Sequence, residues 1–352
     1  MKIILLSPLP PPAGGIASWT ERFIKDKEVL KHELSIINTS VNGKRINQLN
    51  KKNYFDESIR TIRIFNELRK KLVYSEKGIV HINTPCGNLG IIRDYICGKI
   101  SKKFGYKLVT HCRCDVTFML RSKVSKFFFK KLIKLSDKVI TLNTVSKSYV
   151  NKECGKETII IPNFISVDKD LVQHLKIRKE AKKILFVGHV TKQKGCEEIF
   201  KVANYFPDLK FKLVGYVSDE IKALKKPKNV LLLGEKNKEE VLKIMGNEDI
   251  FLFPTYTEGF PNVVTEAMKS GLPIISTSVG AIPDMLESHG AIFIQVGNVD
   301  DMKNAIITLK DDYKNRERMS LWNQKKVLEE YTQEKVIKKI INLYEELFNY
   351  KT

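Results

Sequence analysis

Short apolar runs alternate with amphipathic stretches along most of this chain of 352 residues. In the first half, the amphipathic stretches include Arg60–Leu72 and Lys123–Leu135, where apolar residues recur with helical spacing. Strands and helices that alternate in sequence usually form a parallel sheet with helices on both faces, so we predict a doubly wound α/β fold. The apolar runs predict strands at Lys2–Leu6, Leu34–Ile37, Ile79–Ile82, Lys107–Thr110, Lys138–Leu142 and Thr158–Ile161.

A second series of the same kind predicts a second unit of similar architecture. The segment 168–183 between the two series is polar and rich in lysine, which is typical of a linker between domains. We therefore expect an N-terminal domain at residues 1–167 and a C-terminal domain at residues 168–332. A last helical pattern, Val327–Phe348, is interrupted near Tyr331. The strands predicted in the second series are Lys183–Gly188, Leu209–Val214, Val230–Leu233, Ile250–Phe253, Pro273–Ser276 and Ala291–Ile294.

The positive charge of the chain is concentrated in its first half. The net charge is +21; residues 1–175 hold 32 Lys and Arg against 15 Asp and Glu, whereas residues 176–352 hold 29 against 25. A general bias toward lysine would raise the charge of both halves. The imbalance therefore favours an anionic partner for the first half.

Composition argues against several classes of protein. A hydrophobic content of 43% is typical of a globular protein with a core. No apolar run reaches the roughly 18 residues of a membrane span, and the apolar run at the N-terminus is too short for a secretory signal. We expect free thiols in a reducing cytoplasm, because only Cys112 and Cys114 are close in sequence and Cys-x-Cys is not a zinc-binding spacing.

The loop after Ile250–Phe253 carries the most informative chemistry. Glu258 and Glu266 are eight residues apart, and a Gly-Phe-Pro-Asn turn between them leads into a predicted helix. Two solvated glutamates would be the simplest interpretation of this spacing alone. However, open α/β sheets bind ligands at the carboxyl ends of their strands, near helix N-termini. We therefore expect both carboxylates to face one small polar ligand.

These residues resemble a known family. The segments Gly259–Met268, Gly271–Ile275 and Val279–Asp284 are similar to the donor-binding signature of the family-four (group 1) retaining glycosyltransferases. The similarity is dense from about Ile184 to Tyr344 and looser over the first 150 residues. It implies the GT-B fold, in which two Rossmann-like domains face each other across a cleft. It also implies that the C-terminal helix, at about residues 333–352, crosses back to the first domain.

The resemblance implies roles for the residues of the acidic loop. A nucleotide-sugar needs carboxylates for its hydroxyl groups and cations or backbone N–H groups for its phosphates. Glu266 is similar to the glutamate that binds the ribose, and Glu258 resembles the one that reaches the donor sugar. The backbone N–H groups expected to meet the sugar and the diphosphate belong to Gly259, Phe260, Asn262 and Val263.

Two further loops are implied to bind phosphate. Lys194 matches the family lysine that neutralises the leaving diphosphate, but His189 stands where the family usually has arginine. Either Lys192 supplies the missing charge or phosphate binding is weaker, since histidine is only partly charged near neutral pH. Gly14 and Gly15 follow the first strand, where glycine lets the backbone approach a ligand. They do not form the Gly-x-Gly-x-x-Gly fingerprint, so NAD is not supported.

The N-terminal half offers candidate residues for catalysis and acceptor binding. His111 ends a predicted strand, and the family often has a histidine at such a position near the transferred sugar; otherwise it is a structural histidine. With Lys194 and Glu258 it completes the candidate catalytic set. The candidate acceptor-binding residues at neighbouring strand ends are Asn83, Arg113 and Asp115.

The segment Arg121–Lys134 is the densest cationic stretch. As a helix it would present Lys123, Lys126, Lys130 and Lys134 on one stripe, with Lys131 beside them. An apolar stripe would be formed by Val124, Phe127, Phe128 and Leu132. Such a helix can lie on an anionic membrane surface, at roughly 1 kcal/mol for each lysine near the surface. The alternative is an ordinary amphipathic helix packed on the sheet with solvated lysines.

The resemblance implies sugar transfer with retention, in which the leaving diphosphate accepts the proton of the acceptor. We expect no cofactor and no divalent metal, because no Asp-x-Asp motif occurs in a suitable loop. The expected donor is a UDP- or GDP-sugar, and the expected acceptor is a glycan or a polyprenyl-linked glycan of a bacterial cell-surface polysaccharide. We expect the protein in the cytoplasm, at the inner face of the plasma membrane. The alternatives are a nucleotide-sugar 2-epimerase of the same architecture and a nucleic-acid-binding protein. The second alternative is supported only by the positive charge of the chain.

Overall fold

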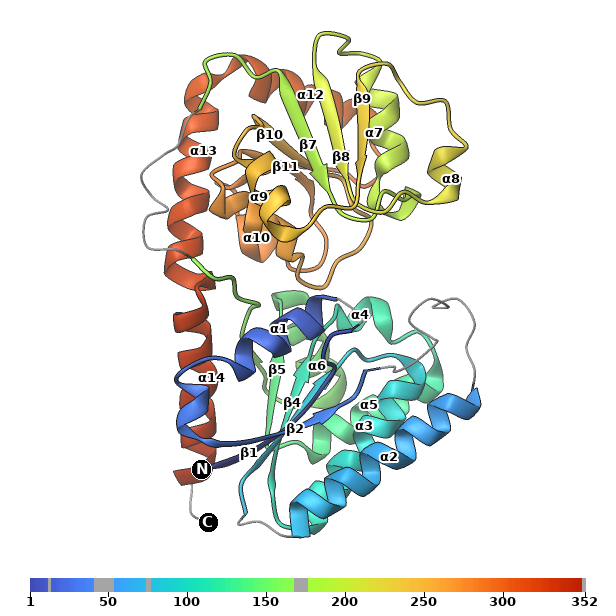
Figure 1. Ribbon diagram of the computed structural model, residues 1–352, viewed down its shortest axis with the longest axis vertical. Helices are drawn as coiled ribbons and strands as arrows, with labels where there is room; N and C mark the ends of the chain where they lie inside the picture. Colours follow the sequence, from blue (N-terminus) through green and yellow to red (C-terminus); the bar gives the residue numbers. More distant parts are fainter. Residues whose placement is uncertain (12–13, 41–53, 74–76, 168–176, 350–352) are drawn as a thin grey trace. The chain divides into compact units, whose positions relative to one another are not determined.

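The computed structural model of the chain describes residues 1–11, 14–40, 54–73, 77–167 and 177–349. The chain divides into two compact units (Figure 1). The N-terminal unit comprises Met1–Asn163 with Glu334–Thr352, and the C-terminal unit comprises Phe164–Gln333. The boundary expected after residue 167 therefore lies four residues later than the division of the structure.

The N-terminal unit contains a six-stranded parallel sheet in the order β2-β1-β3-β4-β5-β6. Its strands are β1 (Lys2–Ser7), β2 (Glu33–Asn38), β3 (Ile79–Thr84), β4 (Lys107–Cys112), β5 (Lys138–Thr141) and β6 (Ile159–Ile160). Its helices are α1 (Gly15–Ile24), η1 (Val29–Lys31), α2 (Tyr54–Val73), α3 (Asn88–Lys103), α4 (Val116–Met119), α5 (Lys123–Leu135), α6 (Thr144–Cys154) and α14 (Gln333–Asn349).

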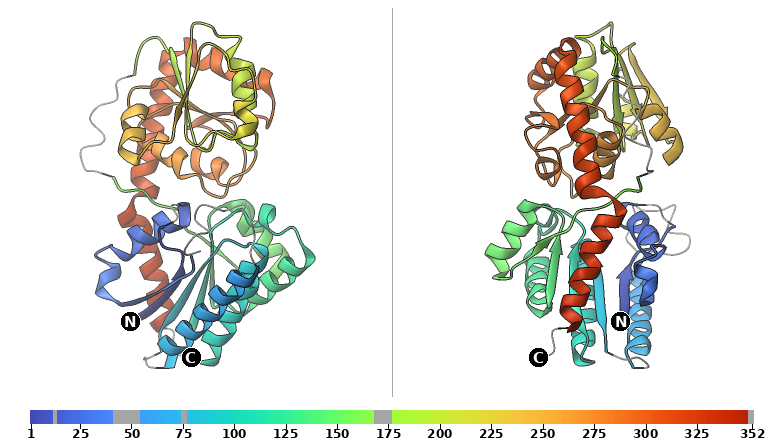
Figure 2. Two further views of the ribbon diagram at one scale, coloured as in Figure 1. Left: turned by 45° about the vertical axis from the view of Figure 1, so that its right-hand side comes forward. Right: turned by 90° about the vertical axis from the view of Figure 1, so that its left-hand side faces the viewer.

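Helices cover both faces of this sheet. On one face, Ile4 and Val80 of the sheet share an apolar cluster with Leu68 of α2, Ile91 of α3 and Phe129 of α5. The other face carries the buried rings of His81 and His111, which lie beside Trp19 of α1. This face is covered by α1 and α14, and α14 runs beside the sheet in both views of Figure 2. Both β1 and β3 are buried along almost their whole length, and β1 is accordingly a nearly continuous apolar run. In β3 the run is interrupted by His81, which contacts α14.

The last helix is joined to this second face by a buried hydrogen bond. His81 of β3 is bonded through Nδ1 to the hydroxyl of Tyr344 on α14. Both side chains are fully buried. The ring of Trp19 on α1 lies 6.3 Å from the His81 ring, so α1 and α14 pack on the same face.

The C-terminal unit contains a second six-stranded parallel sheet, in the order β12-β11-β10-β7-β8-β9. Its strands are β7 (Lys183–Val187), β8 (Lys210–Val214), β9 (Val230–Gly234), β10 (Ile250–Phe253), β11 (Ile274–Thr277) and β12 (Ala291–Ile294). Its helices are η4 (Lys192–Lys194), α7 (Cys196–Ala203), α8 (Asp219–Lys222), α9 (Lys238–Met245), α10 (Asn262–Lys269), α11 (Ile282–Leu286), α12 (Val299–Asp311), α13 (Tyr313–Lys326) and η5 (Val327–Tyr331).

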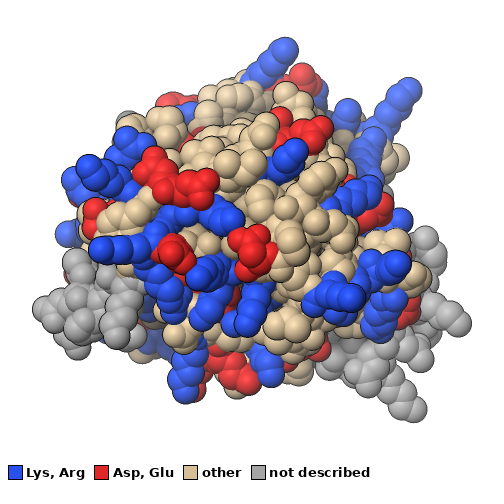
Figure 3. All heavy atoms as spheres, turned by 90° about the horizontal axis from the view of Figure 1, so that it is seen from above, with Lys and Arg blue, Asp and Glu red and all other residues tan. Residues whose placement is uncertain are grey.

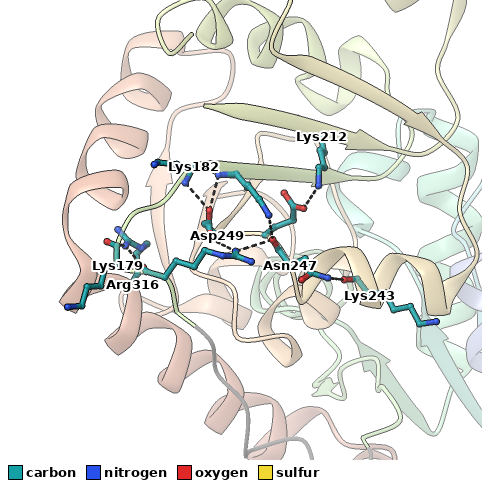
Figure 4. Close-up of polar contacts among 10 residues, drawn as sticks. Lys179, Lys182, Lys212, Lys243, Asn247, Asp249 and Arg316 are labelled. Carbon is teal, nitrogen blue, oxygen red and sulfur yellow. Dashed lines mark hydrogen bonds and ion pairs between the residues drawn. The ribbon is translucent and has the colours of Figure 1, made fainter. Parts of the chain in front are cut away.

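A polar network closes the amino-terminal ends of β7 and β10 (Figure 4). Asp249 accepts hydrogen bonds from the backbone N–H groups of Lys182 and Lys183 at 2.8 and 2.9 Å. Its other oxygen accepts from Arg178 at 2.6 Å, and buried Arg316 donates to the carbonyl of Lys179. The charges are satisfied within the unit, so this end of the sheet serves to fix the chain where it enters β7.

The predicted fold class is confirmed. Each predicted strand is present, with ends that differ from the prediction by at most two residues. The interruption expected near Tyr331 is the π-helical turn η5, after which α14 begins at Gln333.

Candidate functional site

Lys194 and Glu258 form an ion pair at the carboxyl edge of the C-terminal sheet. Lys194 ends η4, after β7, and Glu258 lies on the loop after β10. The two strands are parallel neighbours, so their following loops meet at the same edge. The Lys194 Nζ lies 2.5 Å from Glu258 Oε1, and the two side chains are 25% and 14% exposed. A cation and a carboxylate are thus held together where open α/β sheets bind ligands.

The environment of Glu258 favours a tightly held carboxyl group. Burial raises its pKa, while the charge of Lys194 and hydrogen bonds from Lys194 and Thr255 act in the opposite direction. The loop is fixed by a close backbone approach: a Cβ added to Gly280, whose φ is +58°, would lie 1.9 Å from the Glu258 carbonyl oxygen. Only glycine fits there without a shift of the backbone.

The loop after Glu258 leads into α10, as the sequence predicts. Phe260 is buried, and its ring packs edge-on against Tyr331 at 5.7 Å between centroids. Gly259, Asn262 and Val263 are half-buried around the first turn of α10. Glu266 is half-buried one turn further along the helix.

His189 and Lys192 lie on the loop before Lys194. His189 is exposed, and its ring lies 6.4 Å from that of Tyr216. Lys192 is also exposed, and its Nζ lies 3.1 Å from Glu197 on α7. Lys192 is therefore paired with a carboxylate of α7, whereas Lys194 is paired with Glu258, a carboxylate of the acidic loop.

In the N-terminal unit, the two candidate glycines precede and begin α1. Gly14 is the N-cap residue of α1 and is exposed, and a Cβ added to it would meet nothing within 4 Å. Its φ of −177° is ordinary extended backbone. The fold therefore does not require glycine at this position. The preceding residues 12–13 lie outside the described part of the chain.

His111 and Arg113 are brought together at the carboxyl end of β4. Arg113 donates a hydrogen bond to His111 Nε2 at 3.0 Å, which makes this nitrogen an acceptor and the imidazole neutral. Burial, and then the charge of Arg113, lower the pKa of His111 well below its usual range. Asn83 is the neighbour of His111 in the pairing of β3 with β4 and donates to Ser7 Oγ at 2.9 Å.

Asp115, the third candidate for acceptor binding, has a clear structural task. Its Oδ1 accepts hydrogen bonds from the backbone N–H groups of Thr117 and Phe118 at 2.9 and 3.3 Å, so it caps α4. It also accepts from the Thr117 hydroxyl at 2.6 Å.

The basic helix differs in detail from the predicted stripe. Lys123, Lys126, Lys131 and Lys134 of α5 are exposed, but Lys130 is paired with Glu153 at 3.0 Å. Val124 and Phe127 are 57% and 56% exposed, although the sequence places them on the apolar stripe. The helix packs through Phe129, Leu132 and Ile133 instead.

Sequence reasoning assigned no tertiary contact to three residues that support the candidate sites, although Gly280 lies in the segment Val279–Asp284 that carries the family resemblance. Trp19 supports Arg113, Thr255 bonds to Glu258, and Gly280 holds the Glu258 loop. One signal was available: Trp19 is one of two tryptophans in the chain and lies shortly after the glycine pair.

No group of three or more His, Cys, Asp or Glu side chains in the described ranges is arranged to hold a metal ion. Within the same part of the chain, no helix has both the length and the apolar character needed to cross a bilayer.

The C-terminal unit is similar to a known protein family. Residues 167–326 match the model of the family Glycosyl transferases group 1. An uncharacterized protein from the cps region of Klebsiella pneumoniae is 25% identical over 337 residues, 89% of each chain. The capsular polysaccharide biosynthesis glycosyltransferase CapM of Staphylococcus aureus is 24% identical and spans 81% of this chain and 82% of its own length.

The fold of both units is shared with a solved structure. HepE from Anabaena, solved in complex with UDP, matches with a TM-score of 0.76 at 15% identity, over 98% of this chain and all of that one. The architecture is therefore that of the GT-B fold, and the segment 167–326, a little under half of the chain, is similar to the family Glycosyl transferases group 1.

Proposed function

We propose that the chain transfers a sugar from a nucleotide-sugar, a UDP- or GDP-sugar, to a glycan acceptor in the synthesis of a cell-surface polysaccharide. The observation that carries this proposal is the ion pair of Lys194 with Glu258 at the carboxyl edge of the C-terminal sheet. The similarity to CapM, a glycosyltransferase of capsular polysaccharide biosynthesis, supports the pathway, and the similarity to HepE, solved with UDP, supports the donor class.

In the proposed complex, the diphosphate of the donor takes the place of Glu258 beside Lys194. The lysine then neutralises the leaving group, and the released carboxylate accepts hydrogen bonds from the donor sugar. Glu266 binds the ribose hydroxyls from the second turn of α10. The backbone N–H groups of Gly259, Phe260, Asn262 and Val263 surround the sugar and the diphosphate. His189, Gly14 and Gly15 complete the phosphate contacts.

We further propose that transfer retains the anomeric configuration and needs neither a metal nor a cofactor. The leaving diphosphate accepts the proton of the attacking hydroxyl on the same face of the sugar. Catalysis then depends on positioning and on charge stabilisation by Lys194. His111, neutral and buried, acts by hydrogen bonding near the transferred sugar.

The proposed acceptor is carried on a lipid, and α5 is the proposed contact with the anionic inner face of the membrane. Exposed Val124 and Phe127 lie among Lys123, Lys126, Lys131 and Lys134. An apolar side chain that enters the headgroup region beside lysines that remain at its surface is the usual arrangement of an interfacial helix. On the face drawn in Figure 3, by contrast, acidic and basic side chains are interspersed.

The test is a thermal-shift series with UDP, GDP, ADP and their sugars, followed by product analysis. A nucleotide that binds the folded chain raises its melting temperature. At a hundredfold excess over Kd, binding adds about 2.7 kcal/mol to the free energy of unfolding. Transfer must depend on an added acceptor. Conversion of the donor to an epimer without acceptor would instead establish the 2-epimerase, and a chain stabilised by no nucleotide would refute both activities.

A further inference from the structure

Arg113 is a buried cation whose hydrogen-bond partners are neutral. Arg113 is only 7% exposed. It donates to His111 Nε2 at 3.0 Å and to Asn163 Oδ1 at 2.7 Å. Its Nε has no partner among the described residues. No ion pair within the same residues joins it to a carboxylate.

Other buried arginines of the chain are compensated. Arg93 forms an ion pair with Asp94 at 2.7 Å. Arg316 donates to the backbone carbonyls of Lys310, Arg178 and Lys179 at 2.8 Å. Burial lowers the pKa of Arg316, and the negative charges of Asp249 and Asp312 act to raise it. A buried charge without an opposite charge is costly, so it is usually paired. Arg113 departs from this pattern within the same chain.

The surroundings of Arg113 keep the charge in place without neutralising it. The guanidinium lies 4.3 Å from the ring centroid of Trp19, which is itself stacked on Phe23 at 4.7 Å. Burial, and then the charge of Arg22, lower the pKa of Arg113 to about 9. The nearest acidic residue in sequence, Asp115, is used as the cap of α4.

The position of Arg113 is one where ligands bind. It follows β4 at the carboxyl edge of the N-terminal sheet, and its N–H continues the pairing with Thr84 of β3. Two more buried polar atoms at this edge, Asn83 Oδ1 and His111 Nδ1, have no partner among the described residues. A cation and two unused hydrogen-bonding atoms are thus gathered on adjacent strand ends.

We propose that Arg113 binds a phosphate group of a substrate and is an anion-binding side chain of the N-terminal unit. The inference rests on the proposed function, which supplies two sources of this group: the diphosphate of the donor and the diphosphate of a lipid-linked acceptor. The planar guanidinium can bind a phosphate through two parallel hydrogen bonds, and the phosphate supplies the missing opposite charge.

The experiment is isothermal titration of the full-length chain with three probes. UDP represents the donor, farnesyl diphosphate added to the UDP-saturated chain represents the lipid-linked acceptor, and inorganic pyrophosphate carries only the shared group. In Arg113→Gln, at least one titration should weaken by about 10-fold or more, the loss of a charge-assisted hydrogen bond. A loss with UDP assigns the donor, and a loss with farnesyl diphosphate alone assigns the acceptor.

Arg121→Gln is the matched control, because Arg121 is exposed and stacks on Phe118 at 4.3 Å. It should change none of the titrations. Arg113→Lys keeps the charge but loses the planar guanidinium, so its affinity for the probes should lie between those of wild type and Arg113→Gln. If circular dichroism shows that Arg113→Gln does not fold, the inference is tested with Arg113→Lys alone. Unchanged binding of all three probes in a folded Arg113 variant, or no binding of any probe by wild type, overturns the inference. A wild-type chain that binds pyrophosphate but not UDP would refute the donor proposal alone.

Discussion

The Lys194 ammonium lies 2.5 Å from the Glu258 carboxylate, although 64 residues separate them in sequence. The contact unites the loops after two neighbouring strands. We expect Lys194→Ala to lower turnover about 100-fold or more, since it removes the charge that stabilises the leaving diphosphate. Steady-state kinetics and UDP titration measure the loss.

The matched control is Lys201→Ala. Lys201 is exposed and pairs with Glu197 at 2.9 Å, a surface ion pair of about 0–1 kcal/mol. Its removal should leave turnover near that of wild type. Lys192→Ala tests the remaining alternative: a loss as large as that of Lys194→Ala would mean that Lys192 leaves Glu197 and supplies the charge missing at His189. Full activity in Lys194→Ala would refute the proposed donor site.

Replacement by alanine should lower the stability of the chain at Gly280 but not at Gly14. In Gly280→Ala, the new methyl group meets the Glu258 carbonyl oxygen at a positive φ, so we expect a destabilisation of about 1–3 kcal/mol and weaker UDP binding. In Gly14→Ala, no atom lies within 4 Å of the new methyl group, and stability should stay within about 0.5 kcal/mol. Denaturant unfolding measures both. If Gly14→Ala is as stable and as active as wild type, the proposed approach of a ligand to Gly14 is wrong.

The N-terminal unit should lose stability in mild acid. Burial lowers the pKa of His81 to about 3, whereas the histidine of the unfolded chain titrates near 6.5. Between these values the unfolded state binds a proton that the folded state does not, so the free energy of unfolding falls as pH falls from about 6.5 toward 3. The slope is at most about 1.4 kcal/mol per pH unit for each such histidine. His111, with its lowered pKa, acts in the same direction.

Urea unfolding at a series of pH values tests this expectation. His81→Gln removes one titrating group and should flatten the dependence below pH 6.5. His289, which is exposed on the C-terminal unit, provides the control, and His289→Gln should leave the slope unchanged. Equal slopes in wild type and His81→Gln would show that His81 is protonated in the folded state.

Reversal of two exposed charges on α5 should release the chain from anionic vesicles. Each lysine near such a surface contributes about 1 kcal/mol, so the double variant Lys126→Glu, Lys131→Glu should weaken binding by well over 10-fold. Sedimentation with phosphatidylglycerol vesicles measures binding, and added salt should weaken it in wild type.

The control for this measurement is Lys338→Glu, Lys339→Glu, which reverses the same charge on the exposed face of α14. A general attraction of the basic chain to the vesicle would be reduced equally by both pairs. Phe127→Ala separates the two proposed components, since it removes an exposed apolar side chain and keeps every lysine.

Regular elements could be predicted well because their signals are local. The buried run Ile250–Phe253 and the amphipathic stretch Lys123–Leu135 appear with unchanged ends as β10 and α5. Their patterns can be recognised without knowledge of neighbouring residues, since β10 is an apolar run buried on both faces and α5 has apolar residues at helical spacing.

Contacts between distant residues could not be predicted in the same way. The pairing of Lys130 with Glu153 depends on how α5 lies against α6, which also decides that Phe127 is exposed and Phe129 buried. The contact of Arg113 with Trp19 depends on how α1 crosses the sheet. The sequence contains these residues but does not state their distances.

The hydrogen bond between His81 and Tyr344 has a consequence for protein synthesis. The N-terminal unit is not one continuous stretch of the chain, since α14 is translated only after residues 164–333. While the ribosome makes those residues, the face of the first sheet that contains His81 lacks its final helix. This unit therefore begins to fold first and is completed last.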